Sequence, residues 1–261
     1  MKIKIDYMKS AQENANDYYG KSKRLIIKKA GAEKAIRHLE KRLAEQRARP
    51  SEKKERRVVK TVEKKWYEKF HWFYTSNNML AIGGRDAHQN ETLNSKHFEE
   101  KDLFFHADIF GASAMILIDG TSSPVEVREE VAQFAACYSR AWEEMLRSVD
   151  VYAMRRNQVS KSTAKGSLGT GSFLLTGERE WFRNMTLNLA MHIKDGELHT
   201  VPLATFMKLG LKTPYVTITQ GSIKKSDAAK KVMQALGYED LDNVMRQLPN
   251  GTFKIEAHQA R

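Results

Sequence analysis

The N-terminal part of the chain carries the pattern of a long amphipathic helix. Between residues 10 and 47, apolar positions recur at intervals of seven, four, three and four, at Leu25, Ala32, Ile36, Leu39 and Leu43. Such spacings place the side chains on one stripe of a helix, in a heptad-like seam. Ser10 and Glu13 have the spacing of an N-terminal capping box. We therefore expect a helix over residues 10–47.

Pro50 and Ser51 interrupt this pattern. Proline ends a helix, and serine is a good cap for the start of another. An apolar spacing of three to four then continues from residue 52 to Trp66. The sequence thus predicts two antiparallel helices, joined near residues 49–51.

Beyond Trp66 the apolar positions come in short runs separated by turn residues, a pattern typical of strands. Asn77-Asn78 lies between two such runs and has the chemistry of a tight hairpin turn. Runs with helical spacing alternate irregularly with these strands. We expect strands over residues 72–76, 79–82, 102–107, 114–118, 149–155, 172–176 and 215–219, a hairpin around 195–196, and helices over 87–98, 125–145, 226–236 and 241–248.

Irregular alternation with frequent hairpins favours an α+β fold with a mixed or antiparallel sheet over a doubly wound one. We expect three parts: a basic antiparallel coiled-coil hairpin over residues 1–65, an α+β domain over 66–185, and a small α+β extension over 186–261 packed on that domain.

Charge is distributed unevenly along the chain. Residues 1–65 contain 21 Lys and Arg against 9 Asp and Glu, and so account for the whole formal net charge of +12. This asymmetry suggests a basic arm on a neutral body, with a polyanion as partner, although a solvated helix rich in lysine gives the same composition. Cys137 is the only cysteine, and no apolar run is long enough to span a membrane. A cytoplasmic protein without disulfides or a membrane segment is expected.

The segment from Gly83 to Glu91 carries the most pointed candidate chemistry. The two glycines after the strand permit close backbone approach, and the helix start that follows offers free N–H groups to an anion. The arginine adds a planar guanidinium group that suits phosphate. The alternative is a tight structural turn capped by Asp86. The candidate ligand-binding residues here are Gly83, Gly84, Arg85, Asp86, Asn90 and Glu91.

Two further segments are candidates. His106 and Asp108 would lie on the same side of a strand, so they could perform acid–base chemistry or hold a metal. Alternatively, the pair orders the following loop, in which Gly111, Ala112 and Ser113 would line a ligand groove. Ser160 and Lys161 precede a loop of small residues and could grip phosphate, unless that loop is merely solvated. No catalytic motif stands out, and no metal or cofactor is expected.

Four ordered segments resemble the NFACT RNA-binding domain of the NEMF/RqcH group of ribosome-associated quality-control factors. They read WFYTSNNMLAIGGRDAHQNE, DLFFHADIFGASAMILI, AACYSRAW and VSKSTAKGSLGTGSF. The upstream basic segment is similar to the family's coiled-coil region, and the tail resembles the extension of archaeal members. The resemblance implies that residues 66–185 bind RNA, that the partners are rRNA or tRNA on the large ribosomal subunit, and that the protein is not an enzyme.

The resemblance also assigns roles to residues. The glycine–arginine segment and the loop after His106 would form adjacent walls of one RNA-binding surface, Ser160 and Lys161 would face phosphate, and the helical arm would clamp rRNA through Lys53, Lys54, Arg56 and Arg57. The family's large N-terminal domain is absent from this sequence, so we expect either a short form of the family or a fragment covering its C-terminal half. C-terminal tailing of nascent chains does not carry over to this chain alone. A separate protein could supply that domain, and the hairpin could form a homodimer.

Two alternatives from other classes stay open at this stage. A metal-dependent nuclease or phosphoesterase would use His106 and Asp108, with Asp86 as a further carboxylate. A protein-interaction scaffold would instead grip its partner through the helical hairpin. Metal-dependent cleavage of labelled tRNA would distinguish a nuclease from an RNA-binding protein. Association with a partner protein that survives nuclease treatment and high salt would indicate the scaffold.

Overall fold

The structure, a computed structural model, describes residues 4–48, 65–163 and 166–259. The chain divides into two compact units, Met1–Glu63 and Lys64–Arg261. The second helix of the expected hairpin lies outside the described residues, together with Lys53, Lys54, Arg56 and Arg57. The finer boundary at residue 185 stays a prediction.

The first unit contains α1 (Ala11–Ala48), which confirms the long helix expected from the apolar spacing. Its seam is open to solvent, since the side chains of Leu25, Ile36 and Leu39 are 64%, 54% and 56% exposed. An apolar stripe of this kind is normally buried against a protein core or against a second helix. Within the described residues, α1 therefore presents an unburied apolar seam.

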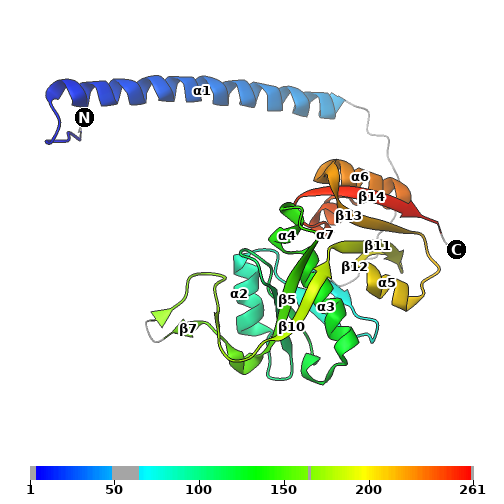
Figure 1. The fold of residues 1–261 in the computed structure, drawn as a ribbon. Coiled ribbons are helices and arrows are strands. Elements are labelled where there is room, and N and C mark those ends of the chain that lie inside the picture. The colour runs from blue at the N-terminus through cyan, green and yellow to red at the C-terminus, as the bar shows by residue number, and fades with distance from the viewer. Residues whose placement is uncertain (1–3, 49–64, 164–165, 260–261) are drawn as a thin grey trace. The chain divides into compact units, whose positions relative to one another are not determined.

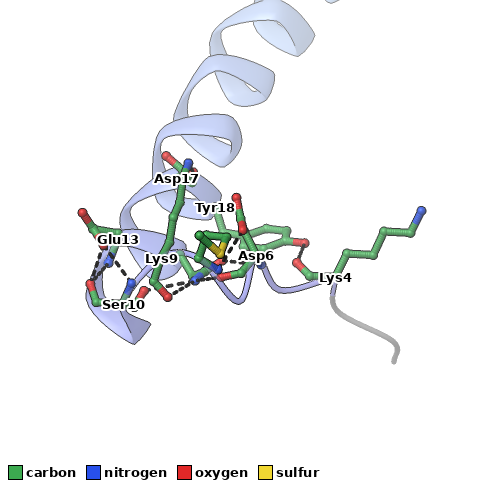
Figure 2. Close-up of polar contacts among 9 residues, drawn as sticks. Lys4, Asp6, Lys9, Ser10, Glu13, Asp17 and Tyr18 are labelled. Atoms are coloured by element: carbon green, nitrogen blue, oxygen red, sulfur yellow. Dashed lines mark hydrogen bonds and ion pairs between the residues drawn. The ribbon is translucent and has the colours of Figure 1, made fainter.

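Residues 4–10 fold back onto the first turns of α1 (Figure 2). The backbone N–H of Ser10 donates to Glu13 Oε2 (2.8 Å), and the N–H of Glu13 donates to Ser10 Oγ (3.3 Å), so the expected capping box is formed. The Tyr18 hydroxyl donates to the carbonyl oxygen of Lys4 (2.6 Å). The two bonds between Ser10 and Glu13 satisfy N–H groups that lack intrahelical partners at the helix start, and the Tyr18 bond holds Lys4 against the helix.

A six-stranded sheet, in the order β1-β2-β4-β3-β5-β10, forms the centre of the second unit (Figure 1). Every neighbouring pair in it is antiparallel. The predicted turn at Asn77-Asn78 joins the first two strands, with Asn78 at φ 59°. The strands are β1 (His71–Tyr74), β2 (Leu80–Gly83), β3 (Leu103–Ala107), β4 (Met115–Leu117), β5 (Ser148–Arg155) and β10 (Glu180–Thr186).

Both faces of this sheet are covered. Leu103 and Phe105 of β3 join the apolar cluster that includes α3 (Val125–Cys137), whereas Phe104 joins the opposite cluster that includes Leu93 of α2 (Ala87–Lys96). Successive side chains of a strand point to opposite faces of the sheet, so the segment LFFHA contributes residues to the apolar clusters on both faces. This explains why β3 reads as a continuous apolar run.

The helix expected over residues 125–145 is in fact two helices. α3 ends at Cys137, and α4 (Arg140–Glu143) starts anew after Ser139. The hydroxyl of Ser139 accepts from the N–H of Ala141 (3.2 Å) and so caps α4. A serine that bonds to the backbone in this way favours a helix start over a helix interior.

A four-stranded antiparallel sheet, in the order β12-β11-β13-β14, follows the first one. The predicted hairpin at Asp195-Gly196 joins two of its strands, and both residues have positive φ. Its strands are β11 (Asn188–Lys194), β12 (Glu197–Pro202), β13 (Tyr215–Lys224) and β14 (Thr252–His258), and its helices are α5 (Leu203–Leu209), α6 (Lys225–Leu236) and α7 (Leu241–Gln247).

The two sheets of the second unit share one core. Trp142 of α4 is fully buried, its indole N–H donates to the carbonyl of Thr252 (3.3 Å), and its ring lies 5.9 Å from that of Phe253 in β14. One apolar cluster includes buried residues of both sheets together with α3 and α6. The residues on either side of the predicted boundary therefore share contacts within one core, and the division into two domains stays a prediction.

Short elements complete the unit. They are η1 (Gly120–Ser122), η2 (Arg156–Gln158) and two small ribbons that pair β6 (Val159–Ser160) with β9 (Leu174–Leu175) and β7 (Ser162–Thr163) with β8 (Gly166–Ser167). None of the described helices has the length and apolar character needed to cross a membrane. The α+β class is confirmed, with a long N-terminal helix and antiparallel sheets.

Candidate functional site

Residues of α4, α6 and α7 and of the edge strand β1 line a cavity of about 750 Å³. Its walls come from segments far apart in the sequence: β1, the turn after β2, the β3–β4 loop, the junction of α3 and α4, and the C-terminal helices. The lining residues are His71, Arg85, Gly111, Ser113, Tyr138, Ser139, Arg140, Glu143, Lys225, Asp242, Met245, Arg246, Leu248, Pro249 and Asn250.

Arg85 enters this cavity from the turn between β2 and α2. One guanidinium nitrogen donates to the carbonyl of Phe70 (2.9 Å), while its Nε is buried without a hydrogen-bond partner. Burial lowers the pKa of Arg85, and the nearby charge of Arg246 acts in the same direction. Within the described residues no carboxylate pairs with this guanidinium, so its charge is only partly compensated.

Lys225 and Arg246 bring two more cations from the C-terminal helices. Burial lowers the pKa of the Lys225 ammonium, and repulsion from Arg85 lowers it further. In the part of the chain that the structure describes, neither Lys225 nor Arg246 forms a side-chain hydrogen bond or an ion pair. Cations held together in this way repel one another, and a bound anion would relieve that repulsion.

His71 lies on the same wall as these cations. Its ring stacks on Tyr138 at 3.9 Å between centroids. Burial holds the pKa of His71 well below its usual value of 6.5, and the charges of Arg85 and Lys225 add to the effect. His71 is therefore neutral at pH 7, and its protonation would be favoured by a negative charge placed in the cavity.

Hydrogen bonds between its walls hold the cavity open. The Tyr138 hydroxyl donates to the carbonyl of Gln247 at the end of α7 (2.5 Å). The side-chain amide of Gln220 in β13 donates to the carbonyls of Ala141 (3.0 Å) and Trp142 (3.1 Å) in α4. These bonds join the C-terminal extension to the α3–α4 junction, so the cations converge on a preorganised site.

The cavity suits an anion with several oxygen atoms. Arg85, Arg140, Lys225 and Arg246 outnumber the two acids on its wall, Glu143 and Asp242. Guanidinium groups and an ammonium can donate several hydrogen bonds to one phosphate or carboxylate group. No group of three or more His, Cys, Asp or Glu side chains able to hold a metal ion occurs among the described residues.

Comparisons with known proteins match the part of the chain that forms five of the six strands of the central sheet, β1 to β5. Residues 69–177 match the family described as the NFACT protein RNA binding domain. The archaeal Rqc2 homolog aRqcH of Methanocaldococcus jannaschii is 35% identical over 74% of this chain and 30% of its own length. The ribosome quality control complex subunit NEMF of Homo sapiens is 36% identical over 66% of this chain and 16% of its own length.

Residues 69–177 belong to the NFACT RNA-binding domain family. The chain spans less than a third of the length of these curated relatives. A solved structure, that of the C-terminal part of the fibronectin/fibrinogen-binding protein from Streptococcus suis, aligns with 50% of each chain at 21% identity and a TM-score of 0.40.

The NFACT RNA-binding domain supplies only part of the cavity. His71, Arg85, Gly111 and Ser113 lie within the matched residues 69–177, as does the α3–α4 junction. Lys225 and Arg246 lie outside the match, in α6 and α7. Two of the four cations on the wall thus come from the C-terminal extension.

The glycines beside Arg85 have a packing role. A Cβ at Gly83 would lie 2.2 Å from Met115 Sδ, and a Cβ at Gly84 would lie 2.1 Å from Asn90 Oδ1. The buried Asn90 side chain accepts from the backbone N–H of Ala114 (3.2 Å) and so ties α2 to the start of β4. Asp86 caps α2 by accepting from the N–H of Gln89 (2.8 Å), as expected. These residues position Arg85 and do not line the cavity.

Glu91 and Lys161 contact each other away from the cavity wall. Lys161 Nζ lies 3.2 Å from Glu91 Oε2 and donates to the carbonyl of Gly169 (2.7 Å). The same Glu91 oxygen accepts from the N–H of Gly171 (3.3 Å). The Ser160 hydroxyl donates to the carbonyl of Ser162 (3.1 Å). In the structure Lys161 thus fastens its own loop to α2; its proposed contact with phosphate stays a prediction.

His106 is half-buried in the sheet below the β3–β4 loop. Its Nδ1 lies 3.3 Å from the Tyr152 hydroxyl, and burial lowers its pKa. Asp108 lies 4.0 Å from Arg179, with its side chain half exposed. Ala112 is buried, whereas Gly111 and Ser113 reach the cavity. His106 and Asp108 thus contact Tyr152 and Arg179 in the structure, and their binding, catalytic or loop-ordering roles stay predictions.

Sequence reasoning missed several cavity residues, namely His71, Tyr138, Arg140, Lys225 and Arg246. A signal existed for two of them, because Tyr138 and Arg140 lie in the AACYSRAW segment. Lys225 and Arg246 carry no local signal, since a lysine at a helix start and an arginine in a last turn are ordinary surface residues.

Proposed function

We propose that this protein is a non-enzymatic RNA-binding factor that acts on the large ribosomal subunit or its tRNA during quality control of stalled nascent chains. The family that residues 69–177 match is described as RNA binding, and similar proteins are named as ribosome quality control complex subunits. The observation that carries the proposal is the convergence of Arg85, Lys225 and Arg246 on one cavity.

RNA phosphate is the anion that fits this setting best. A phosphate presents several acceptor oxygens to the guanidinium and ammonium donors, and its charge relieves their mutual repulsion. The basic arm, through Lys53, Lys54, Arg56 and Arg57, would add contacts to rRNA that do not depend on base sequence. We expect this to take place in the cytoplasm, with a separate N-terminal protein or a second copy of the chain as possible further partners.

The test is RNA affinity as a function of salt. Fluorescence anisotropy with labelled tRNA, and with large-subunit rRNA fragments, measures the dissociation constant of the full chain. Affinity falls steeply from low to moderate salt if Lys and Arg displace counterions. Arg85→Ala weakens binding and lowers the slope of log affinity against log salt by about 1.

Arg147→Ala is the matched control, because Arg147 is exposed and does not line the cavity. Thermal unfolding of both variants checks that the fold is retained. Salt-independent binding, or an Arg85→Ala protein that binds like the wild type, would count against the proposal. Mg²⁺-dependent cleavage of the labelled RNA that is lost in His106→Ala would favour the nuclease alternative instead.

A further inference from the structure

Phe110 is the most exposed large apolar side chain of the second unit among the described residues, at 87% exposure. It lies at the tip of the β3–β4 loop, between Ile109, which packs against the core, and Gly111, which lines the cavity. A phenylalanine that leaves nearly its whole surface in water gains nothing from folding. Single exposed apolar residues are common on protein surfaces, so what distinguishes Phe110 is its position next to the cavity-lining Gly111.

The loop backbone fixes this exposure. Gly111 has φ +77°, a left-handed conformation that glycine adopts without strain, and the chain reverses there. A Cβ at this glycine would lie 3.9 Å from Arg140 Cδ, so the turn runs directly beside a cation of the cavity wall. With consecutive Cα atoms about 3.8 Å apart, the aromatic residue begins at the cavity's edge.

An aromatic ring beside a cluster of phosphate-binding cations is the combination that proteins use for unpaired nucleotides. The ring stacks on a base, and the cations take the backbone phosphate. A paired base has its faces covered within the helix, so only a splayed base can use such a platform. The exposed ring and the cationic cavity thus fit two chemically different parts of one ligand.

We infer that the cavity and Phe110 together bind one unpaired nucleotide of RNA, with its phosphate against Arg85, Lys225 and Arg246 and its base on the Phe110 ring. This inference rests on the proposed RNA-binding function and adds the ligand class. It also makes the C-terminal extension part of the binding site, because α6 and α7 supply Lys225 and Arg246.

The experiment compares a labelled single-stranded RNA oligomer with the same strand annealed to its complement, using the full chain. Phe110→Ala weakens binding of the single strand at least about fivefold and leaves duplex binding unchanged, whereas Phe110→Tyr keeps the wild-type affinity. Lys225→Ala and Arg246→Ala also weaken binding of the single strand, and inorganic phosphate competes with it.

Met207→Ala and Lys231→Ala are matched controls. Met207 is an exposed apolar residue on α5, and Lys231 is an exposed lysine on the same helix as Lys225. Neither lines the cavity, so neither variant changes single-strand affinity. Because Phe110 is exposed, its replacement leaves the thermal unfolding midpoint unchanged.

The outcomes separate this inference from the function on which it rests. Salt-sensitive RNA binding that is unaffected by Phe110→Ala would overturn the unpaired-nucleotide site and leave the RNA-binding function standing. Equal loss of single-strand and duplex binding would overturn it as well, because stacking on an unpaired base would not be involved. A chain that binds no RNA at all would overturn both.

Discussion

At the scale of single residues, the turn after β2 shows how closely packing and chemistry are combined. Gly84 lets the backbone of α2 approach, Asn90 fills the space so created, and Arg85 is directed into the cavity. The sequence predicted the importance of this turn, but not which of its residues contact a ligand. That distinction depends on neighbours from β4 and α7, which local spacing does not reveal.

Gly84→Ala tests this packing. The added Cβ would lie 2.1 Å from Asn90 Oδ1 and 2.7 Å from the Asn90 backbone nitrogen, which cannot move aside without shifting α2. We expect the free energy of unfolding to fall by about 1–3 kcal/mol, as for other overpacked sites. Urea unfolding measures this. Gly169→Ala is the control, since no heavy atom lies within 4 Å of its Cβ position, and equal stability of the two variants would contradict the packing role.

At the scale of elements, periodicity alone predicted much of the fold. The long helix, the Asn77-Asn78 hairpin and α6 occupy the expected positions. The break between α3 and α4 was missed because it rests on one serine cap in an otherwise helical pattern. β14 was missed because its alternation, TFKIEAH, is short and follows a turn. How these elements pack into a cavity follows from long-range contacts that no single segment encodes.

Trp142 is the contact between elements that we expect to be most costly to remove. Its buried indole joins α4 to β14 and lies behind the cavity wall. Trp142→Ala should lower the free energy of unfolding by about 3–5 kcal/mol, because it leaves a large space between the two sheets. Trp142→Phe loses the indole N–H and part of the buried ring, so it should cost less, about 1–3 kcal/mol.

Equilibrium urea unfolding of both Trp142 variants provides the measurement. A single transition at a lower midpoint is expected, because one core serves both sheets. Two separate transitions, or an unchanged midpoint in Trp142→Ala, would show that the C-terminal extension is stable independently of the rest of the unit.

At the scale of the whole molecule, charge and cavity occupy different parts of the chain. The excess of Lys and Arg lies in residues 1–65, whereas the cavity is formed entirely by the unit Lys64–Arg261. Composition predicted a polyanion partner from the basic arm alone. The proposed site in the cavity would add a second mode of anion binding, in which a few partly buried cations act at short range, where salt screens them less.

Removing residues 1–63 separates these two modes. The truncated chain should bind single-stranded RNA more weakly and with a smaller salt slope, since the displaced counterions follow the number of phosphate contacts. Its remaining affinity should still fall on Arg85→Ala. Anisotropy titrations at several salt concentrations measure both effects. Unchanged affinity after truncation would show that residues 1–63 do not contribute to RNA binding. A truncated chain whose affinity does not change on Arg85→Ala would show that the cavity does not bind RNA.

The most direct measurement of the central claim is the titration of His71 with and without RNA. Burial and two neighbouring cations hold its pKa well below 6.5 in the free protein. A phosphate in the cavity favours the protonated imidazole, so the pKa of His71 should rise when single-stranded RNA binds, and affinity should increase as the pH falls toward that value. NMR of the imidazole, assigned with His71→Gln, reports this directly. A His71 pKa that stays unchanged in the RNA complex would show that the phosphate lies elsewhere.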